Sequence, residues 1–392
     1  MVPACPLIEV SGPPRERGRS YGRQAASRIH LGVAHYSQQL QAQGFGSSQL
    51  NEVVAGYLPQ IEAFDASYVD EMRGIAEGAE LAFEQIVLLN ARTEILQLAE
   101  RQANGGKPFH DDDPDGCTGI VALPEATAAG RLLHAQNWDW KAECAETAVV
   151  LKVYRDDGPD LLTFTEAGGL ARSGLNAAGI AITANYLECE RDYRSTGVPL
   201  ALLRRKVLEQ KHLALAFRAV YCTPKSASNN IIISHAQGLV INFECAPDET
   251  FQVHAQGGLV VHANHWQSPV ALAKLVDTGV DSTPDSLYRD LRVRGLLEPY
   301  RGQLALAHVK AALFDDFESP WSVCRPPRLS RSQQLSATVA MIAMDPALGL
   351  LEVAMLPALH REFQIFRLEM DFKPTENPLT FALPSTLRRA SA

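Results

Sequence analysis

The residues with the clearest capacity for chemistry lie between Asp115 and Asp139. Within this stretch, Cys117 directly follows Asp115-Gly116 and precedes an apolar run of high β-propensity. Glycine lacks a Cβ atom, so the chain at Gly116 can take a tight conformation beside the thiol. A thiol in this place can attack the peptide carbonyl that precedes it. The pattern therefore predicts a chain that cuts itself between Gly116 and Cys117.

Such a cut leaves Cys117 as a new N-terminus, with a thiol nucleophile and an α-amine base on one residue. The ordinary pKa of a thiol is about 8.5 and that of an α-amine is about 7.7–8.0, so a proton passes between them at little cost near neutral pH. The local sequence also allows a buried structural cysteine at the start of a strand, because free cysteine is among the most buried residue types.

Nine short motifs follow one another in order through roughly residues 70–360 of the chain. They are residues 73–79, 89–94, 115–118, 123–124, 136–139, 165–168, 174–179, 196–199 and 261–265. Together they resemble the fungal acyl-coenzyme A:isopenicillin N acyltransferase (penicillin acyltransferase) family. The most specific part is the pair formed by Gly-Cys-Thr at 116–118 and Asn-Trp-Asp at 137–139.

The resemblance implies an N-terminal-nucleophile hydrolase in which Cys117 attacks and a thioester acyl-enzyme forms. It implies that Asp139 is an active-site carboxylate, which could orient the α-ammonium through a charge-assisted hydrogen bond. It assigns part of the oxyanion hole to Asn264, and Asn137 is a weaker second candidate. The expected pieces, residues 1–116 and 117–392, would remain associated.

The substrate-contacting residues differ in part from the family pattern. Gly119 replaces a threonine, Lys141 replaces an aromatic residue, and Ser-Arg at 330–331 lies four residues before the family's serine–arginine position. We expect substrate contacts from Thr118, Gly119, Trp140, Lys141 and Arg331. These departures favour a small N-acyl amide over penicillin precursors, with an acyl-CoA as a further acyl compound. Lys141 favours a polar or anionic group on the substrate.

Other residues keep alternative functions open. His262 and His265 follow Cys117 by 145 and 148 residues, close to the cysteine-to-histidine spacing of papain-like peptidases. A binding protein that kept the fold without turnover is a third class. Arg92 and Glu94 could support the cleavage region or form a helix-terminal salt bridge. The acidic run at 111–113 reads as a solvated linker, and no metal or cofactor site is expected.

Composition narrows the class of protein further. The chain has 392 residues, 46% of them hydrophobic and 21% charged, as in a globular protein. Its net charge of −9 disfavours nucleic acid as a partner. Seven widely spaced cysteines without a C-x-x-C pair indicate reduced thiols and a cytoplasmic location. No apolar run reaches the length of a membrane span and no signal-peptide pattern opens the chain.

The order of elements predicts an α+β fold in a single domain over residues 1–392. Helices are expected from about residue 15 to 41, near 49–64, between 69 and 98, at 198–210 and 213–222, after Pro284, and near 303–314. Short β-rich segments occupy much of the rest after Cys117, and strands are expected at 148–154, 161–165, 231–234, 240–243 and 259–262, with a turn at 176–179. Two antiparallel sheets packed together and covered by helices would bury their apolar faces. The resemblance implies the same four-layer αββα sandwich.

Overall fold

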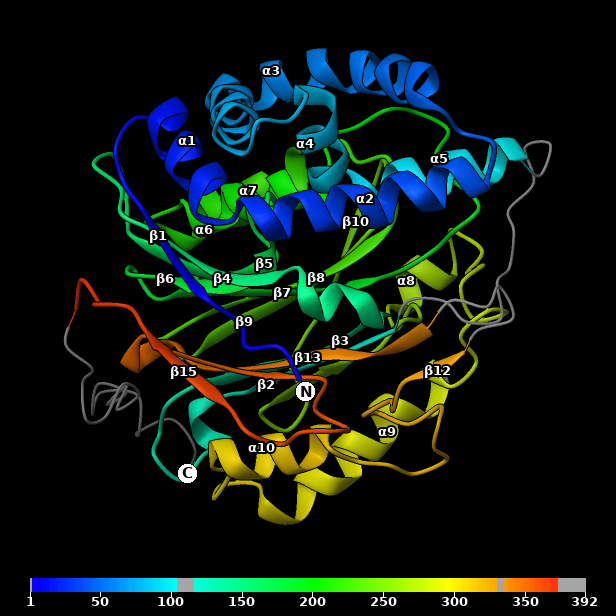
Figure 1. Cartoon of the computed structure of the whole chain (residues 1–392). Helices are drawn as coiled ribbons and strands as arrows, with labels where there is room; N and C mark the ends of the chain where they lie inside the picture. Colours follow the sequence, from blue (N-terminus) through cyan, green and yellow to red (C-terminus); the bar gives the residue numbers. More distant parts are fainter. Residues whose placement is uncertain (1, 104–115, 330–334, 373–392) are drawn as a thin grey trace, which may run out of the picture.

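Two β-sheets lie face to face in the middle of the molecule, with helices on both outer sides (Figure 1). The computed structural model describes residues 2–103, 116–329 and 335–372. The helices are α1 (Pro14–Gln24), α2 (Ala26–Ala42), α3 (Ser47–Ala79), α4 (Phe83–Asn90), α5 (Arg92–Ala103), α6 (Leu200–Leu208), α7 (Leu213–Cys222), α8 (Pro269–Leu272), α9 (Ser286–Leu297) and α10 (Leu306–Leu313).

The strands form one sheet of eight and one of seven. They are β1 (Leu7–Val10), β2 (Cys117–Ala122), β3 (Leu133–Lys141), β4 (Ala148–Val153), β5 (Leu161–Glu166), β6 (Ser173–Asn176), β7 (Ile180–Tyr186), β8 (Asn229–His235), β9 (Leu239–Cys245), β10 (Thr250–Val253), β11 (Leu259–His262), β12 (Arg328–Leu329), β13 (Leu335–Asp345), β14 (Leu350–Met355) and β15 (Gln364–Arg367).

Antiparallel pairing dominates both sheets. The first sheet has the order β1-β4-β5-β6-β7-β8-β9-β10, and only its β1–β4 pair is parallel. The second has the order β11-β2-β3-β13-β14-β15, with β12 paired to β13. Helices α1–α7 cover the first sheet and helices α9 and α10 cover the second (Figure 1). The predicted four-layer αββα architecture is confirmed.

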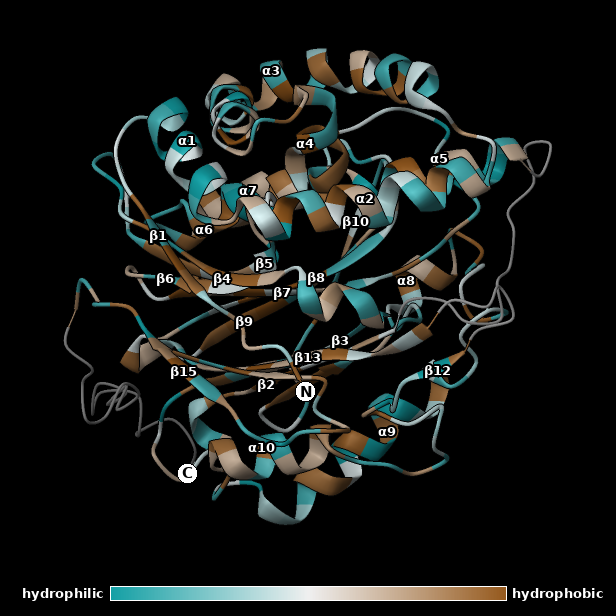
Figure 2. Cartoon of the chain, viewed as in Figure 1, coloured by the Kyte–Doolittle hydropathy of each residue, from teal (hydrophilic) through white to brown (hydrophobic). Residues whose placement is uncertain are grey.

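Hydrophobic residues concentrate along the strands of both sheets, while the outer helices carry both hydrophobic and hydrophilic residues (Figure 2). The largest buried cluster joins the first sheet, the helices above it and the facing side of the second sheet. A second cluster lies between α9, α10 and the outer face of the second sheet. Burial of these faces supplies the main stabilising free energy of the sandwich.

The helix expected from residue 15 to 41 divides at Ala25, so this prediction was wrong in its length. Helix α1 packs against α3 with the two backbones in close contact. A Cβ atom added to Gly18 or Gly22 would come within 3 Å of carbonyl oxygens of α3, so only glycine fits at these positions. Helix α2 instead packs on α4 and α5, and therefore runs in another direction. These glycines mark a close helix crossing, a role that the sequence did not disclose.

Most other elements lie where the sequence placed them. The expected strands at 148–154, 161–165, 231–234, 240–243 and 259–262 correspond to β4, β5, β8, β9 and β11. Strand β6 was missed, because its four residues looked like part of the turn at 176–179. Strand β15 was also missed. Within the described ranges, no helix is long and apolar enough to cross a membrane.

Candidate active site

Strands β2 and β3 hold the proposed cleavage bond at the end of their antiparallel ladder. Cys117 pairs with Trp138, and the next position out places Gly116 beside Asp139. The backbone N–H of Asp139 donates a hydrogen bond to the Gly116 carbonyl oxygen at 2.8 Å. An N–H donor at this oxygen polarises the carbonyl that Cys117 would attack.

Gly116 has no room for a side chain. A Cβ atom built there would lie 2.5 Å from Oδ2 of Asp139 and 2.9 Å from the guanidinium of Arg325. Cross-strand partners project from the same face of a sheet, so Asp139 stands beside Gly116 while the Cys117 thiol projects from the other face with Trp138. The carboxylate therefore lies beside Gly116, the residue that precedes the proposed cleavage bond.

The pairing of β11 with β2 explains why Asn264 reaches Cys117. His262 pairs with Gly119, and continuing this antiparallel register by two residues places Asn264 opposite Cys117. Oδ1 of Asn264 accepts a hydrogen bond from the backbone N–H of Cys117 at 2.8 Å. It also accepts one from Nη2 of Arg289 at 2.9 Å. Two donors converge on this atom, which fixes it as the amide oxygen.

The amide nitrogen of Asn264 faces elsewhere. Nδ2 donates to the carbonyl oxygen of Tyr186 at 2.9 Å. Because a carboxamide has two N–H donors, one proton remains for a developing oxyanion. The assignment of Asn264 to the oxyanion hole stays a prediction, and its oxygen has a second role in holding the nitrogen of Cys117.

Arg289 connects Cys117 to a buried network of charges. Its Nη1 donates to the carbonyl oxygen of Cys117 at 2.8 Å and to Oγ1 of Thr118 at 2.9 Å. Its Nε donates to Oδ2 of Asp285 at 2.7 Å, and Asp285 also pairs with Arg325. Burial by itself would raise the pKa of Asp285, but the two arginines outweigh it and hold that pKa below its ordinary value.

Asp139 closes the same network. Thr338 on β13 donates to Oδ1 of Asp139 at 2.6 Å, and Nε of Arg325 lies 3.5 Å from Oδ2. The buried Oδ2 atom accepts no hydrogen bond within the described part of the chain. A buried carboxylate oxygen that lacks a hydrogen bond favours an incoming cationic donor.

The thiol faces the space between the two sheets, where Arg172 approaches it. Nη2 of Arg172 lies 3.8 Å from Sγ, and its guanidinium lies 4.2 Å from the Trp138 ring centroid. A nearby guanidinium favours the thiolate, which is the nucleophilic form of cysteine. Sequence reasoning missed Arg172, Arg289, Arg325 and Asp285, because no local motif marks them.

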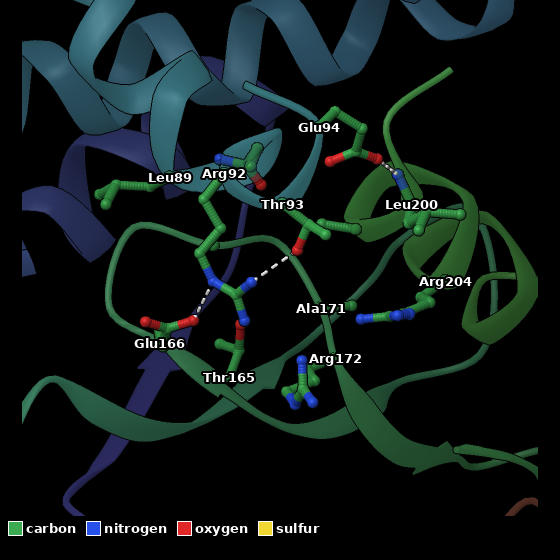
Figure 3. Close-up of a pocket in the computed structure, with 13 residues that line it drawn as sticks. Leu89, Arg92, Thr93, Glu94, Thr165, Glu166, Ala171, Arg172, Leu200 and Arg204 are labelled. Carbon is green, nitrogen blue, oxygen red and sulfur yellow. Dashed lines mark hydrogen bonds and ion pairs between the residues drawn. The ribbon is translucent and has the colours of Figure 1, made fainter. Parts of the chain in front are cut away.

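A small pocket of about 30 Å³ opens at the thiol. Its lining residues are Arg92, Thr93, Cys117, Trp138, Asp139, Trp140, Arg172, Ala184, Tyr186, Leu200, Arg204 and Asn229. A neighbouring hollow shares Arg92, Thr93, Arg172, Leu200 and Arg204 with it. Figure 3 shows this shared region between α5, α6 and the loop that follows β5.

The expected substrate contacts divide among several places. Trp140 lines the pocket and donates through Nε1 to the Tyr36 hydroxyl at 2.9 Å. The hydroxyl of Thr118 accepts a hydrogen bond from Arg289, and Gly119 packs against Ile232 on β8. Lys141 lies at the end of β3, with Nζ 5.8 Å from the Trp140 ring, and is not among the lining residues. Arg331 lies outside the described residues.

The remaining candidates have structural partners. Asn137 donates through Nδ2 to the carbonyl oxygens of Leu313 and Val323, at 2.7 and 2.8 Å, on the α10 side of the sheet. Arg92 forms an ion pair with Glu166 and lines the pocket. Oε1 of Glu94 accepts from the N–H of Leu200 at 2.8 Å, at the start of α6.

The two histidines of the papain-like alternative are engaged away from the thiol. Nε2 of His262 lies 2.8 Å from Glu244 and its Nδ1 lies 2.9 Å from the Ala263 carbonyl. Nδ1 of His265 lies 2.8 Å from the Ser286 hydroxyl. Burial and the neighbouring His262 lower the pKa of His265. These contacts give the cysteine–histidine dyad no support.

Among the described residues, no group of three or more His, Cys, Asp or Glu side chains is arranged to hold a metal. The acidic run at 111–113 lies outside those residues. None of the seven cysteines, all of which lie in the described ranges, forms a disulfide, and only Cys222 is exposed.

Comparison with known proteins assigns the chain to a family. The model of the acyl-coenzyme A:6-aminopenicillanic acid acyl-transferase family matches residues 126–354, more than half of the length. The chain belongs to this family. The resemblance inferred from the sequence motifs is thereby confirmed. The matched residues include Asp139 and Asn264 and begin after Cys117.

A fungal relative agrees with the family assignment. The 40 kDa form of acyl-coenzyme A:6-aminopenicillanic-acid-acyltransferase from Emericella nidulans is 29% identical over 284 residues, covering 71% of this chain and 72% of the relative. Among solved structures, a variant of conjugated bile acid hydrolase from Clostridium perfringens is 13% identical, covers 64% of this chain and 92% of its own, and has a TM-score of 0.46. Penicillin V acylase from Agrobacterium tumefaciens is 16% identical, with coverages of 64% and 86% and a TM-score of 0.41.

Proposed function

We propose that this protein is a self-cleaving N-terminal-cysteine hydrolase or acyltransferase that acts on a small N-acyl amide through a thioester. Membership of an acyltransferase family supports an enzyme of this general type. The observation that carries the finer proposal is the 2.8 Å hydrogen bond from the Asp139 N–H to the Gly116 carbonyl oxygen, next to the Cys117 thiol. An acyl-CoA is a further candidate acyl donor.

Self-cleavage would begin when the sulfur of Cys117 attacks the carbonyl carbon of Gly116. The Asp139 N–H stabilises the charge on the carbonyl oxygen, and the C–N bond breaks as the nitrogen of Cys117 takes a proton. The result is a thioester between Gly116 and the Cys117 side chain. Water hydrolyses it, which gives a carboxylate on Gly116 and restores the thiol.

In the mature enzyme the new α-amine of Cys117 would serve as the base. Oδ1 of Asn264 already lies 2.8 Å from that nitrogen and would keep it in place. Oδ2 of Asp139, which makes no hydrogen bond within the described residues, would accept one from the α-ammonium once Gly116 has left. A substrate carbonyl would then occupy the place of the Gly116 carbonyl, and water or an amine would resolve the acyl-enzyme.

A thiol-directed acyl probe tests this reaction. The wild type should be labelled at Cys117 and should hydrolyse members of a panel of small N-acyl amides, whereas Cys117→Ala should do neither. Cys222→Ala removes an exposed thiol on α7 and should leave both properties unchanged. Absence of both labelling and amide hydrolysis in the wild type would favour the binding-protein class, and a strict requirement for His262 or His265 would favour the papain-like class.

We propose a cytoplasmic location, because seven cysteines without a disulfide suit a reducing compartment.

A further inference from the structure

Arg204 is a buried cation that faces the pocket of Cys117. Its residue is 8% exposed, and it projects from α6 toward the loop that carries Ala171 and Arg172 (Figure 3). Within the described part of the chain, Arg204 has no ion pair and its Nε atom has no hydrogen-bond acceptor. Buried arginines are normally paired, because an isolated buried charge is costly.

The surroundings of Arg204 add positive charge. Arg172 lines the same pocket and reaches the thiol at 3.8 Å, and Arg92 lines it from α5. Among the described residues, none of the three carboxylates that line this region forms an ion pair with Arg204. Glu166 is paired with Arg92, and Asp139 accepts from Thr338. Glu94 accepts from the N–H of Leu200 at the start of α6, where burial raises its pKa.

The chemistry of this cluster is that of an anion site. Burial, followed by repulsion from Arg172 and Arg92, lowers the pKa of Arg204 to about 9. A guanidinium presents several N–H donors in a plane and suits a carboxylate or phosphate oxygen pair. The aromatic faces of Trp138 and Trp140 stack with Arg172 and Arg92 and fix their positions.

We propose that Arg204 and Arg172 bind a carboxylate group of the substrate. The enzyme would then act on N-acyl amides whose anionic group lies in the same pocket as the carbonyl that Cys117 attacks. This inference rests on the proposed function, since it assigns the pocket at Cys117 to the substrate. It places the specificity for an anion on α6 and the β5–β6 loop and not on Lys141.

Matched substrate pairs test the proposal in the mature wild-type enzyme. On the acyl side, a glutaryl anilide is compared with the pentanoyl anilide of equal chain length. On the amine side, N-pentanoylglycine is compared with its amide. At least one carboxylate should be preferred in kcat/KM by about 10- to 100-fold, the range of a charge-assisted hydrogen bond. Equal turnover of both members in both pairs would overturn the anion site and leave the proposed function intact.

Variants locate the preference. Arg204→Gln should erase it by lowering kcat/KM for the carboxylate substrate alone, while Arg204→Lys keeps the charge and should retain part of it. Arg218→Gln removes an exposed arginine on the neighbouring helix α7 and should change neither value. An equal loss for neutral and anionic substrates in Arg204→Gln would show a structural role and contradict the proposal. Intact mass shows that each variant has matured.

A binding measurement decides the question even if no amide of the panel is turned over. Glutarate should raise the Tm of the wild type and not that of Arg204→Gln, because a ligand that binds only the folded state stabilises it. Inorganic phosphate is the second probe. Stabilisation by phosphate alone would overturn the carboxylate assignment, and stabilisation by neither anion would overturn the site. Loss of all amide turnover together with binding of glutarate would count against the proposed function only.

Discussion

The amide oxygen of Asn264 lies 2.8 Å from the backbone nitrogen of Cys117, across 147 positions of sequence. The register of β11 against β2 sets this contact, and Arg289 locks it by donating to the same oxygen. Asn264 thus has two separable parts, an oxygen that holds the nitrogen and an amide that can donate to an oxyanion.

Asn264→Asp separates these two roles, because it keeps an oxygen and removes the N–H donors. We expect self-cleavage to proceed, since the Asp139 N–H serves the scissile carbonyl. Substrate turnover should fall by about 10²–10³ in kcat, the loss found when one oxyanion-hole donor is removed. Rates of cleavage by intact mass and steady-state kinetics measure the two effects. Turnover equal to the wild type would exclude an oxyanion role for Asn264.

Gly116→Ala tests the crowding at the cleavage bond. A methyl group there would lie 2.5 Å from Oδ2 of Asp139 and 2.9 Å from Arg325, so the strand end must shift and the uncut chain should accumulate. The matched control is Gly56→Ala in α3, where an added Cβ meets nothing within 4 Å. Time courses of the cut fraction compare them. If Gly116→Ala matures at the wild-type rate, Gly116 is not placed as described.

Asp285→Asn tests the buried network that joins Arg289 to Arg325. Removing one partner of a buried ion pair costs about 3–5 kcal/mol, because the arginines stay buried with less compensation. The folded-state pKa of Asp285 is depressed, so its stabilisation is present above the unfolded pKa of about 3.9 and is lost as pH falls through the folded value. The difference in unfolding free energy between wild type and variant should therefore shrink only below about pH 4.

Denaturant unfolding at several pH values measures this difference. Asp281→Asn, at an exposed residue of the same loop, is the control and should be neutral. A stability of Asp285→Asn equal to that of the wild type at pH 7 would show that the network contributes nothing to folding.

The two pieces, 1–116 and 117–392, should stay together after cleavage. Strand β1 pairs with β4, Tyr36 donates to Glu166 at 2.5 Å, and Glu94 accepts from Leu200 at 2.8 Å, all across the cut. Buried hydrophobic residues from both pieces form one cluster. Native size-exclusion chromatography followed by denaturing mass spectrometry should find both pieces in one peak. Separate elution without denaturant would contradict this.

Local patterns in the sequence predicted most of the strands, but the pairing that brings Asp139 beside Gly116 comes from the structure. They foretold less of the site, because its charges come from distant elements. Arg289 sits in an ordinary helix α9, and Arg172 follows a strand without any motif. Their positions depend on how the sheets stack and on the register of β11. Asn137 belongs to a matched motif yet points to α10, since strand alternation decides the face that a side chain takes.

The most direct test is the intact mass and N-terminal sequence of the purified wild type beside Cys117→Ala. We predict two wild-type pieces, one of them beginning Cys-Thr-Gly, and a single uncut chain for the variant. A single uncut wild-type chain that still hydrolyses amides would contradict the N-terminal-cysteine mechanism.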